Sequence, residues 1–408
     1  MPKSLQITGN STYGGAGYLL LGWCRYLLAR GWAVDILATD PLWVSELQKI
    51  PGLRIIQNIL IPRDISPAQD VKAFVQLVQL MHQNRYDVVH TYTATPGFLG
   101  RMAARFIRTP VILHHQAGWT VNEFSSWRGR VSYIPLECLV TLASSKSICV
   151  SHAVEQQAHQ FHIAPRSRLV VICNGIDPQP YIAATHNGSA RAALRQELGF
   201  SDDHLLIGNT GRLSAQKDNG SLIQAAASLK LLMPNLRFTL LLVGDGPDQV
   251  KLEQLIRSLA LEEYVRLLGF RRDIATFLAG IDIFVSPSLW EGLSISLLEA
   301  MSAAKPIITT SISPNAELIE HQITGLLVPP RAPDQIAQAI ARFVTEPELA
   351  HSCGSAARQR VLEHYSIDRM FQETWDLYVG LLPEHRLSDP MYPAGKAGAE
   401  ARHRSSGR

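Results

Sequence analysis

The chain has 408 residues. A chain of this length is usually too long to fold around a single hydrophobic core, so we expect two domains. Hydrophobic residues make up 46% and charged residues 18%, which is typical of a globular protein. The net charge of +3 is too small to predict a nucleic-acid partner. The absence of any apolar run of about 18 residues argues against a spanning helix. The N-terminus lacks an apolar signal core, and the five cysteines form no CxxC motif. We therefore expect a cytoplasmic protein with reduced thiols.

Short apolar runs alternate with amphipathic stretches along the whole chain. In the first half the predicted strands are Leu5–Thr8, Ala33–Ala38, Leu53–Ile59, Asp87–Thr91, Val111–His114, Ser147–Ser151 and Leu169–Cys173, with helices at Tyr18–Ala29, Val71–Gln83 and Gly97–Phe106. In the second half the strands are Leu205–Asn209, Phe238–Gly244, Val265–Gly269, Ile281–Val285, Pro306–Thr310 and Gly325–Val328, with helices at Leu222–Leu232, Gln249–Leu259 and Ile336–Phe343. This alternation predicts an α/β fold of two Rossmann-like, doubly wound domains that face each other across a cleft.

Composition sets the expected domain boundaries. The polar stretch Asp177–Asp203 contains Pro178, Pro180 and one short helix-like piece, and we interpret it as the inter-domain connection. The prediction is an N-terminal domain over 1–180 and a second domain over 181–366. A helix over 367–382 follows, with packing against the first domain as an open alternative. The tail over 383–408 has little to bury, so we expect disorder there.

The segment FVSPSLWEGLSISLLEAM (284–301) predicts a buried strand, a turn and a helix start. It carries two acids, Glu291 in the turn and Glu299 about one turn into the helix. A helix start binds anions, so two carboxylates beside it suit a ligand with hydroxyls on both sides of a diphosphate, such as a nucleotide sugar. Two structural alternatives remain open: Ser296 and Glu299 form a capping box, and Glu291 is a solvated loop acid.

Other candidates follow the ends of predicted strands. Gly15 lies in a glycine turn after the first strand, but Leu20 replaces the third glycine of a dinucleotide fingerprint. Arg212 and Lys217 follow the first strand of the second domain, where cations would meet a ligand phosphate. Gly269 and Phe270 end another strand and offer backbone groups to a base edge. Solvated cations and structural turns are the alternative interpretations. No D-x-D, H-E-x-x-H or clustered Cys/His motif occurs, so we predict no metal site.

Taken together, these motifs resemble the retaining glycosyltransferases of family 4, which have the two-domain GT-B fold. The likeness runs from Gly14 to about Leu382 and is most specific around Glu291 and Glu299, which match the E-x7-E motif of the family. Further matches are Arg212 with Lys217, Asn174–Asp177 at the hinge, and Val243–Pro247.

The resemblance implies a role for each matched residue. Glu299 would hold the ribose hydroxyls, and Glu291 would face the donor sugar. Arg212 and Lys217 would grip the diphosphate, whose charge would also meet the backbone N–H groups of Gly292 and Leu293. In the first domain, Gly15 would let the backbone close on the donor. No cofactor is implied.

The family places a histidine before a glycine after its fifth strand, where this chain reads LHHQAGW (113–119). Gln116 or Ala117 occupies that position, depending on register. His115 or His114 would then substitute, and the alternative is that both are structural.

The resemblance further implies a UDP- or GDP-sugar donor and a glycan or lipid-linked acceptor. Two rival functions remain open: a sugar-nucleotide epimerase and a non-catalytic nucleotide-sugar-binding protein. The segment WTVNEFSSWRGR (119–130) mixes aromatic and basic residues, so a peripheral contact with the inner face of the membrane is one interpretation and an ordinary loop the other.

Overall fold

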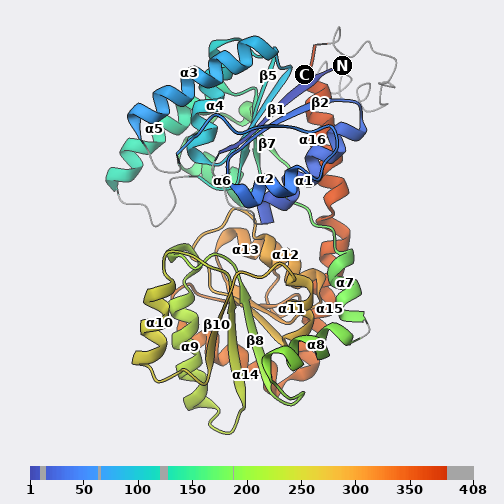
Figure 1. Ribbon diagram of the computed structural model, residues 1–408. Helices are drawn as coiled ribbons and strands as arrows, with labels where there is room; N and C mark the ends of the chain where they lie inside the picture. The colour runs from blue at the N-terminus through green and yellow to red at the C-terminus, as the bar shows by residue number, and fades with distance from the viewer. Residues whose placement is uncertain (10–14, 63–65, 120–126, 187, 384–408) are drawn as a thin grey trace, which may run out of the picture. The chain divides into compact units, whose positions relative to one another are not determined.

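The computed structural model describes residues 1–9, 15–62, 66–119, 127–186 and 188–383, which form two compact units (Figure 1). Unit 1 consists of Met1–Val150, Val154–Ile172 and the chain from Met370 onward. Unit 2 consists of Ser151–Ala153 and Cys173–Arg369. Within these residues, no helix combines the length and apolar character that crossing a bilayer requires.

Unit 1 is built on a seven-stranded parallel sheet with the order β3-β2-β1-β4-β5-β6-β7. Its strands are β1 (Lys3–Gly9), β2 (Ala33–Ala38), β3 (Arg54–Ile56), β4 (Val88–Tyr92), β5 (Val111–Gln116), β6 (Lys146–Cys149) and β7 (Leu169–Val171). The order reverses direction at β1 and β4, as in a doubly wound sheet. The register places Leu5 beside Val89, so apolar side chains of neighbouring strands share one face.

Helices cover both faces of this sheet. They are α1 (Gly15–Ala29), α2 (Pro41–Leu47), α3 (Pro67–Asn84), α4 (Ala94–Phe106), α5 (Trp127–Ala143) and α6 (His152–Gln160), with a 3-10 turn at Arg166–Arg168. Leu5 and Ile7 of β1 point into a buried cluster with Leu77 of α3 and Leu99 of α4. The alternate residue Gln6 points to the other face, where its side chain donates to Tyr378 Oη.

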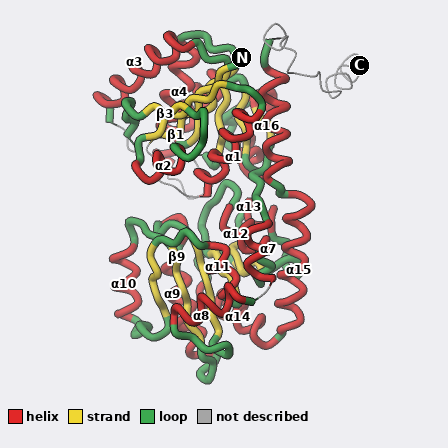
Figure 2. Tube along the Cα trace, turned by 45° about the vertical axis from the view of Figure 1, so that its right-hand side comes forward, coloured by secondary structure: helices red, strands yellow, loops and turns green. Residues whose placement is uncertain are grey.

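The last helix, α16 (Ile367–Leu381), belongs to unit 1 from Met370 onward. Figure 2 shows it beside α1, and the aromatic contacts agree. Tyr378 meets Trp23 edge to face with ring centroids 5.2 Å apart, and it lies 5.6 Å from Trp32. Phe371 packs on Trp23 at 5.7 Å. The end of the chain therefore completes the core of the unit formed by its beginning.

Unit 2 contains a six-stranded parallel sheet with the order β10-β9-β8-β11-β12-β13. The strands are β8 (Leu205–Thr210), β9 (Phe238–Val243), β10 (Val265–Gly269), β11 (Ile283–Ser286), β12 (Ile307–Thr310) and β13 (Leu326–Val328). This is again the doubly wound order, with its reversal between β8 and β11.

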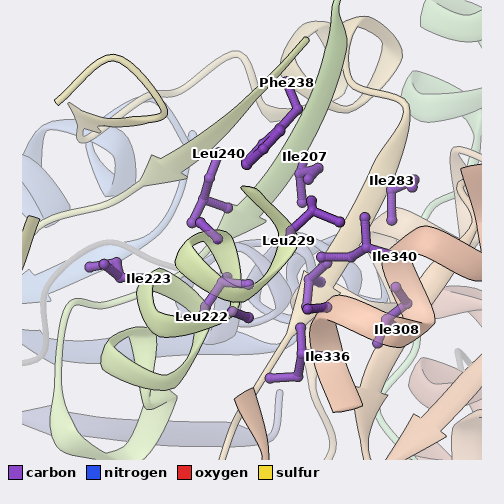
Figure 3. Close-up of a cluster of buried hydrophobic side chains, with 14 of the residues drawn as sticks. Ile207, Leu222, Ile223, Leu229, Phe238, Leu240, Ile283, Ile308, Ile336 and Ile340 are labelled. Atoms are coloured by element: carbon purple, nitrogen blue, oxygen red, sulfur yellow. The ribbon is translucent and has the colours of Figure 1, made fainter. Parts of the chain in front are cut away.

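The unit 2 helices are α7 (Gln179–His186), α8 (Ser189–Leu198), α9 (Asn219–Leu232), α10 (Gln249–Ser258), α11 (Ile274–Gly280), α12 (Ile295–Ser302), α13 (Ser313–Leu318), α14 (Pro333–Thr345) and α15 (Pro347–His364), with a 3-10 turn at Ala215–Lys217. On one face, Ile207 and Leu240 of the strands meet Leu229 of α9 and Ile340 of α14 (Figure 3). On the other face, α11 approaches β8 so closely that a Cβ at Gly208 would lie 2.9 Å from Phe277.

The predicted α/β class and the two doubly wound sheets are confirmed, and each predicted strand has a counterpart at nearly the same residues. One feature was wrong. The stretch 177–203 is not a polar connection with a single helix-like piece, because α7 and α8 occupy most of it. Both helices pack against α11 within unit 2.

Candidate active site

The candidate residues of unit 2 gather at the carboxyl edge of its sheet, around the loops that follow β8 and β11. These strands are neighbours at the point where the strand order reverses, and open α/β sheets bind ligands there. The two loops are joined directly, because Leu289 N–H donates to the Gln216 carbonyl at 2.8 Å and Gln216 Nε2 donates to the Trp290 carbonyl at 2.9 Å.

Glycine backbone makes this edge compact. Gly244, after β9, has a φ of +136°, and a Cβ there would lie 1.9 Å from the Gly211 carbonyl oxygen. Gly246 makes a similar approach to the carbonyl of Leu213. Only a residue without a side chain fits at either position, so the loops after β8 and β9 interlock through glycine.

Lys217 and Glu291 form an ion pair across the two loops. Lys217 Nζ lies 2.5 Å from Glu291 Oε1, and the side chains are 16% and 8% exposed. Gln216 Nε2 approaches the other carboxylate oxygen at 3.4 Å. Glu291 is therefore not the solvated loop acid that one interpretation of the sequence allowed, since both its oxygens are held by the loop that contains Lys217.

Glu299 accepts a hydrogen bond from Tyr181 of α7, with 2.9 Å between Tyr181 Oη and Glu299 Oε1. Burial raises the pKa of Glu299 to about 7, although the Tyr181 hydroxyl and the nearby Lys217 ammonium both favour its charged form. The carboxyl group thus changes charge near neutral pH. The influence of Lys217 on this pKa also places Glu299 in the same neighbourhood as the Lys217–Glu291 pair.

The start of α12 is capped by Ser294, whose hydroxyl accepts from Leu297 N–H at 3.4 Å. The capping box of Ser296 and Glu299 is therefore wrong, because the cap lies two residues earlier and Glu299 binds Tyr181 instead. Just before the cap, Gly292 and Leu293 are buried. Ser151 donates to the Gly292 carbonyl at 2.8 Å and fixes this turn, which leads from Glu291 into the helix.

The remaining unit 2 candidates lie along the same edge. Arg212 follows Gly211 at the end of β8, and its side chain is exposed. Gly269 ends β10 with a φ of +69° and open space where a Cβ would stand. Its carbonyl accepts from Gly244 N–H at 2.8 Å. Phe270, next in the chain, is 50% exposed. This places an exposed apolar ring beside a partly exposed glycine at the end of β10.

Two candidates lie in unit 1. Gly15 begins α1, and Gly14 before it falls outside the described residues. His115 lies near the end of β5 and is partly exposed, with ring contacts to Tyr92 at 5.5 Å and His90 at 6.2 Å. His114 is 3% exposed, and its Nδ1 is 2.9 Å from Thr91 Oγ1. Of the two histidines, only His115 presents its side chain to solvent.

One group of metal-type side chains comes close together in the described part of the chain, namely His152, Cys173 and Glu317, with ligand atoms within 4.8 Å of one another. The Glu317 carboxylate already accepts the backbone N–H groups of His152 and Ala153 at 3.1 and 3.0 Å. These bonds satisfy backbone donors at the start of α6, so the position of Glu317 is explained by this structural role and needs no metal ion.

The sequence did not point to Tyr181 or Gln216. Tyr181 lies on α7, within the stretch interpreted as an inter-domain connection, and it reaches a residue 118 positions away. Gln216 lies between Arg212 and Lys217, but an amide in a loop carries no distinguishing signal. In the structure it bridges the loop after β8 to the loop that bears Glu291.

Comparison with known proteins assigns the class. Residues 13–180 match the model described as Glycosyltransferase Family 4, and residues 190–360 match that of Glycosyl transferases group 1. An Escherichia coli relative named UDP-Gal:alpha-D-GlcNAc-diphosphoundecaprenol alpha-1,3-galactosyltransferase is 28% identical over 78% of this chain and 82% of its own length. The Bacillus subtilis protein named putative glycosyltransferase EpsD is 26% identical over 88% of this chain and 92% of its own length.

The solved structure of Anabaena HepE in complex with UDP-glucose superposes with a TM-score of 0.79, at 25% identity, over 93% of this chain and 99% of that one. The two sheets and these matches define a GT-B glycosyltransferase fold. The chain belongs to the family 4 and group 1 glycosyltransferases and is a transferase. The predicted fold and enzyme class are thereby confirmed, and the rival epimerase finds no support among these relatives.

Proposed function

We propose that the protein transfers a hexose from a UDP-sugar to a glycan or lipid-linked acceptor and retains the anomeric configuration. The observation that carries the proposal is the convergence of the Lys217–Glu291 pair and the Tyr181–Glu299 pair at the switch point of the unit 2 sheet. The names of the E. coli relative and of the HepE complex, both of which specify UDP-sugars, favour UDP over GDP.

In this proposal, the donor diphosphate lies between the loop after β8 and the start of α12. Arg212 and Lys217 bind its charge, and the N–H groups of Gly292 and Leu293 add backbone donors. The acceptor oxygen attacks the anomeric carbon while the bond to the diphosphate breaks. The departing phosphate oxygen takes the proton of the acceptor. Because the barrier falls chiefly by stabilising charge on that phosphate, no separate protein base is needed.

The acids bind the two ends of the donor. Glu299 accepts from the ribose hydroxyls, a role favoured by its carboxyl group being already oriented by Tyr181. Glu291 faces the sugar hydroxyls, and Phe270 with the backbone of Gly269 meets the base. In unit 1, Gly15 allows close approach of the backbone, and His115 replaces the family histidine at the sugar. The partial exposure of His115, in contrast with buried His114, supports that choice.

Mutation of the phosphate-binding residue tests the proposal. Arg212→Ala should lower turnover by a factor of about 10² to 10³, the usual effect of losing one preorganised charge-stabilising donor. Arg257→Ala, an exposed arginine on α10, is the matched control and should leave turnover unchanged. The assay follows release of UDP from UDP-hexoses, and NMR of the product reports its anomeric configuration. Unchanged turnover of folded Arg212→Ala, or an inverted product, would contradict the proposal.

We further propose that the enzyme works without a metal ion in the cytoplasm and touches the inner face of the membrane through α5. This helix exposes Trp127, Leu139 and Leu142, and Arg128 and Arg130 are nearby in the sequence. Exposed Trp and Leu side chains with basic residues suit an anionic lipid surface. Most of the predicted membrane segment, residues 120–126, lies outside the described residues. Flotation of the protein with anionic vesicles should fall when Leu139 and Leu142 are both changed to Gln.

The proposal that no metal ion is needed has its own test: turnover should survive addition of EDTA.

A further inference from the structure

Unit 2 contains a cavity of about 330 Å³ that includes none of the candidate active-site residues. It lies where the ends of several helices meet: the carboxyl end of α7, the start of α8, the ends of α11 and α12, and α15. Ala184, Thr185 and Gly188 line one side, and Ala303 and Ala304 line another. These walls consist largely of small side chains, so the space is bounded mainly by backbone and by the long side chains that enter it.

The long side chains are cationic. Arg191, Lys305 and Arg358 line the cavity, and no aspartate or glutamate is among the lining residues. Arg191 pairs with Asp282 at 2.7 Å, but that carboxylate is shared with Arg195. In the described part of the chain, neither Lys305 nor Arg358 forms an ion pair. The cavity therefore holds more positive charge than the protein neutralises.

The two unpaired cations are held in place by neutral oxygens. Lys305 Nζ donates to the carbonyls of Ala279 and Ile281 at 3.2 and 2.9 Å. Arg358 donates through Nε to the Ser302 carbonyl and through Nη2 to Thr185 Oγ1, each at 2.9 Å. Burial lowers the pKa of Lys305 to about 8 and that of Arg358 below its usual range. The Asp282 carboxylate offsets part of this effect at Lys305, but it is already shared by Arg191 and Arg195. Burying more cations than the nearby carboxylate can neutralise costs free energy, which a bound anion would recover.

We propose that this cavity is a second ligand site, separate from the donor site, that binds a small multivalent anion of the phosphate or phosphomonoester class. Three converging cations suit a phosphate dianion, with the planar guanidiniums of Arg191 and Arg358 as hydrogen-bond donors. The positive end of the ten-residue helix α8 adds to the same field, since Gly188 at its N-cap lines the cavity. The volume lies at the lower end of the range for small-molecule sites and leaves room for a short organic group on the phosphate.

Calorimetric titration of the full chain with inorganic phosphate, and separately with glycerol 3-phosphate, tests the site. Arg358→Gln should weaken binding about tenfold or more, because it removes one charge-assisted contact. Ala184→Glu places a carboxylate at the cavity wall and should weaken binding to at least the same extent. Ala183→Glu is the matched control: the same charge change on the exposed neighbouring residue of α7, outside the lining, should leave affinity within about twofold.

Each titration is repeated with saturating UDP so that phosphate binding at the proposed donor site is recognised. If the donor proposal is wrong, UDP does not change phosphate binding. The comparison of Ala184→Glu with Ala183→Glu then still tests whether the cavity binds the anion. Absence of phosphate binding by the unaltered protein would overturn the proposal. So would equal binding by Ala184→Glu and Ala183→Glu, even if Arg358→Gln fails to fold. A preference for glycerol 3-phosphate identifies an organic phosphate as the ligand class, and a preference for inorganic phosphate identifies the free ion.

Discussion

The Lys217–Glu291 pair is largely withdrawn from water, so its loss should be felt in stability as well as in catalysis. Lys217→Met leaves the Glu291 carboxylate without its cation and should lower the free energy of unfolding by about 3 kcal/mol. Adding Glu291→Leu removes the stranded charge, so the double variant should recover part of that loss. Urea unfolding of both variants provides the measurement.

A surface pair provides the control for this prediction. Lys49 pairs with Glu46 at 2.8 Å, but the lysine side chain is 61% exposed. Lys49→Met should therefore cost no more than about 1 kcal/mol. If Lys217→Met proved no more costly than Lys49→Met, the pair at the candidate site would be as weakly coupled as a surface pair.

Glu299 should make stability depend on pH near neutrality. Its pKa is about 7 in the folded protein and 4.5 when unperturbed, so the folded state binds the proton more tightly. The favourable contribution is complete below pH 4.5 and is lost as pH rises to 7, by about 3 kcal/mol at most. Glu299→Gln cannot titrate, so its Tm should fall less between pH 5 and pH 8 than that of the unaltered protein. Parallel Tm curves for the two proteins would refute the assignment.

The same titration should appear in donor binding. If the Glu299 carboxylate accepts from the ribose, affinity for UDP-glucose should rise as pH passes 7. UDP-glucose suits this measurement because its diphosphate does not change protonation in that range. Glu299→Gln should bind more weakly and without the pH dependence. If the affinity of Glu299→Gln for UDP-glucose still changed with pH, a group other than Glu299 would govern the effect.

At the scale of elements, the interlocked loops after β8 and β9 hold the candidate site together. Gly244→Ala forces a methyl group against the Gly211 carbonyl and places alanine at a φ of +136°. The backbone conformation alone should cost about 1–3 kcal/mol, and the clash adds to it. Thermal unfolding should show a clear loss, and the KM for the donor should rise because the loop bearing Lys217 shifts.

Gly220→Ala is the control for this prediction. Gly220 lies in the first turn of α9, and a Cβ there would meet only Leu255 Cδ2, at 3.8 Å. Alanine is the better helix former, so this variant should be neutral or more stable by about 0.4–1 kcal/mol. If alanine lowered stability equally at Gly220 and Gly244, the interlocking of the loops could not be the cause of the loss at Gly244.

The strands and the main site motif were predictable from the sequence because both are local signals. Each strand of a parallel sheet buried on both faces is a short apolar run, and Glu291 and Glu299 follow one such run. Only one short helix-like piece was predicted where α7 and α8 lie, because that stretch is polar and contains prolines, and α7 has no buried residue. Its conformation depends on packing against α11, a contact distant in sequence. Tyr181, and with it the orientation of Glu299, could not be found without that packing.

At the scale of the whole molecule, the last helix returns to the first unit. Tyr378 of α16 is fully buried, and its hydroxyl lies 2.9 Å from His90 Nδ1 and 3.3 Å from Trp23 Nε1. A chain that ends at residue 366 would uncover the aromatic ring cluster of unit 1 and remove the hydroxyl that accepts the hydrogen bond of Trp23 Nε1. Unit 1 should therefore depend on residues that are synthesised after the whole of unit 2.

The cost of that truncation can be set against the stability of a domain. Met370, Phe371, Tyr378 and Leu382 are each at most 6% exposed, and burial of each such side chain contributes about 1.5–3 kcal/mol. Their combined loss, about 6–12 kcal/mol, is comparable to the entire stability of a typical domain. In the chain ending at 366, limited proteolysis should therefore degrade residues 1–150 and spare unit 2. A chain ending at Pro383, which lacks only the tail predicted to be disordered, should resist like the full chain. Survival of residues 1–150 in the shorter chain would mean that unit 1 folds without its final helix.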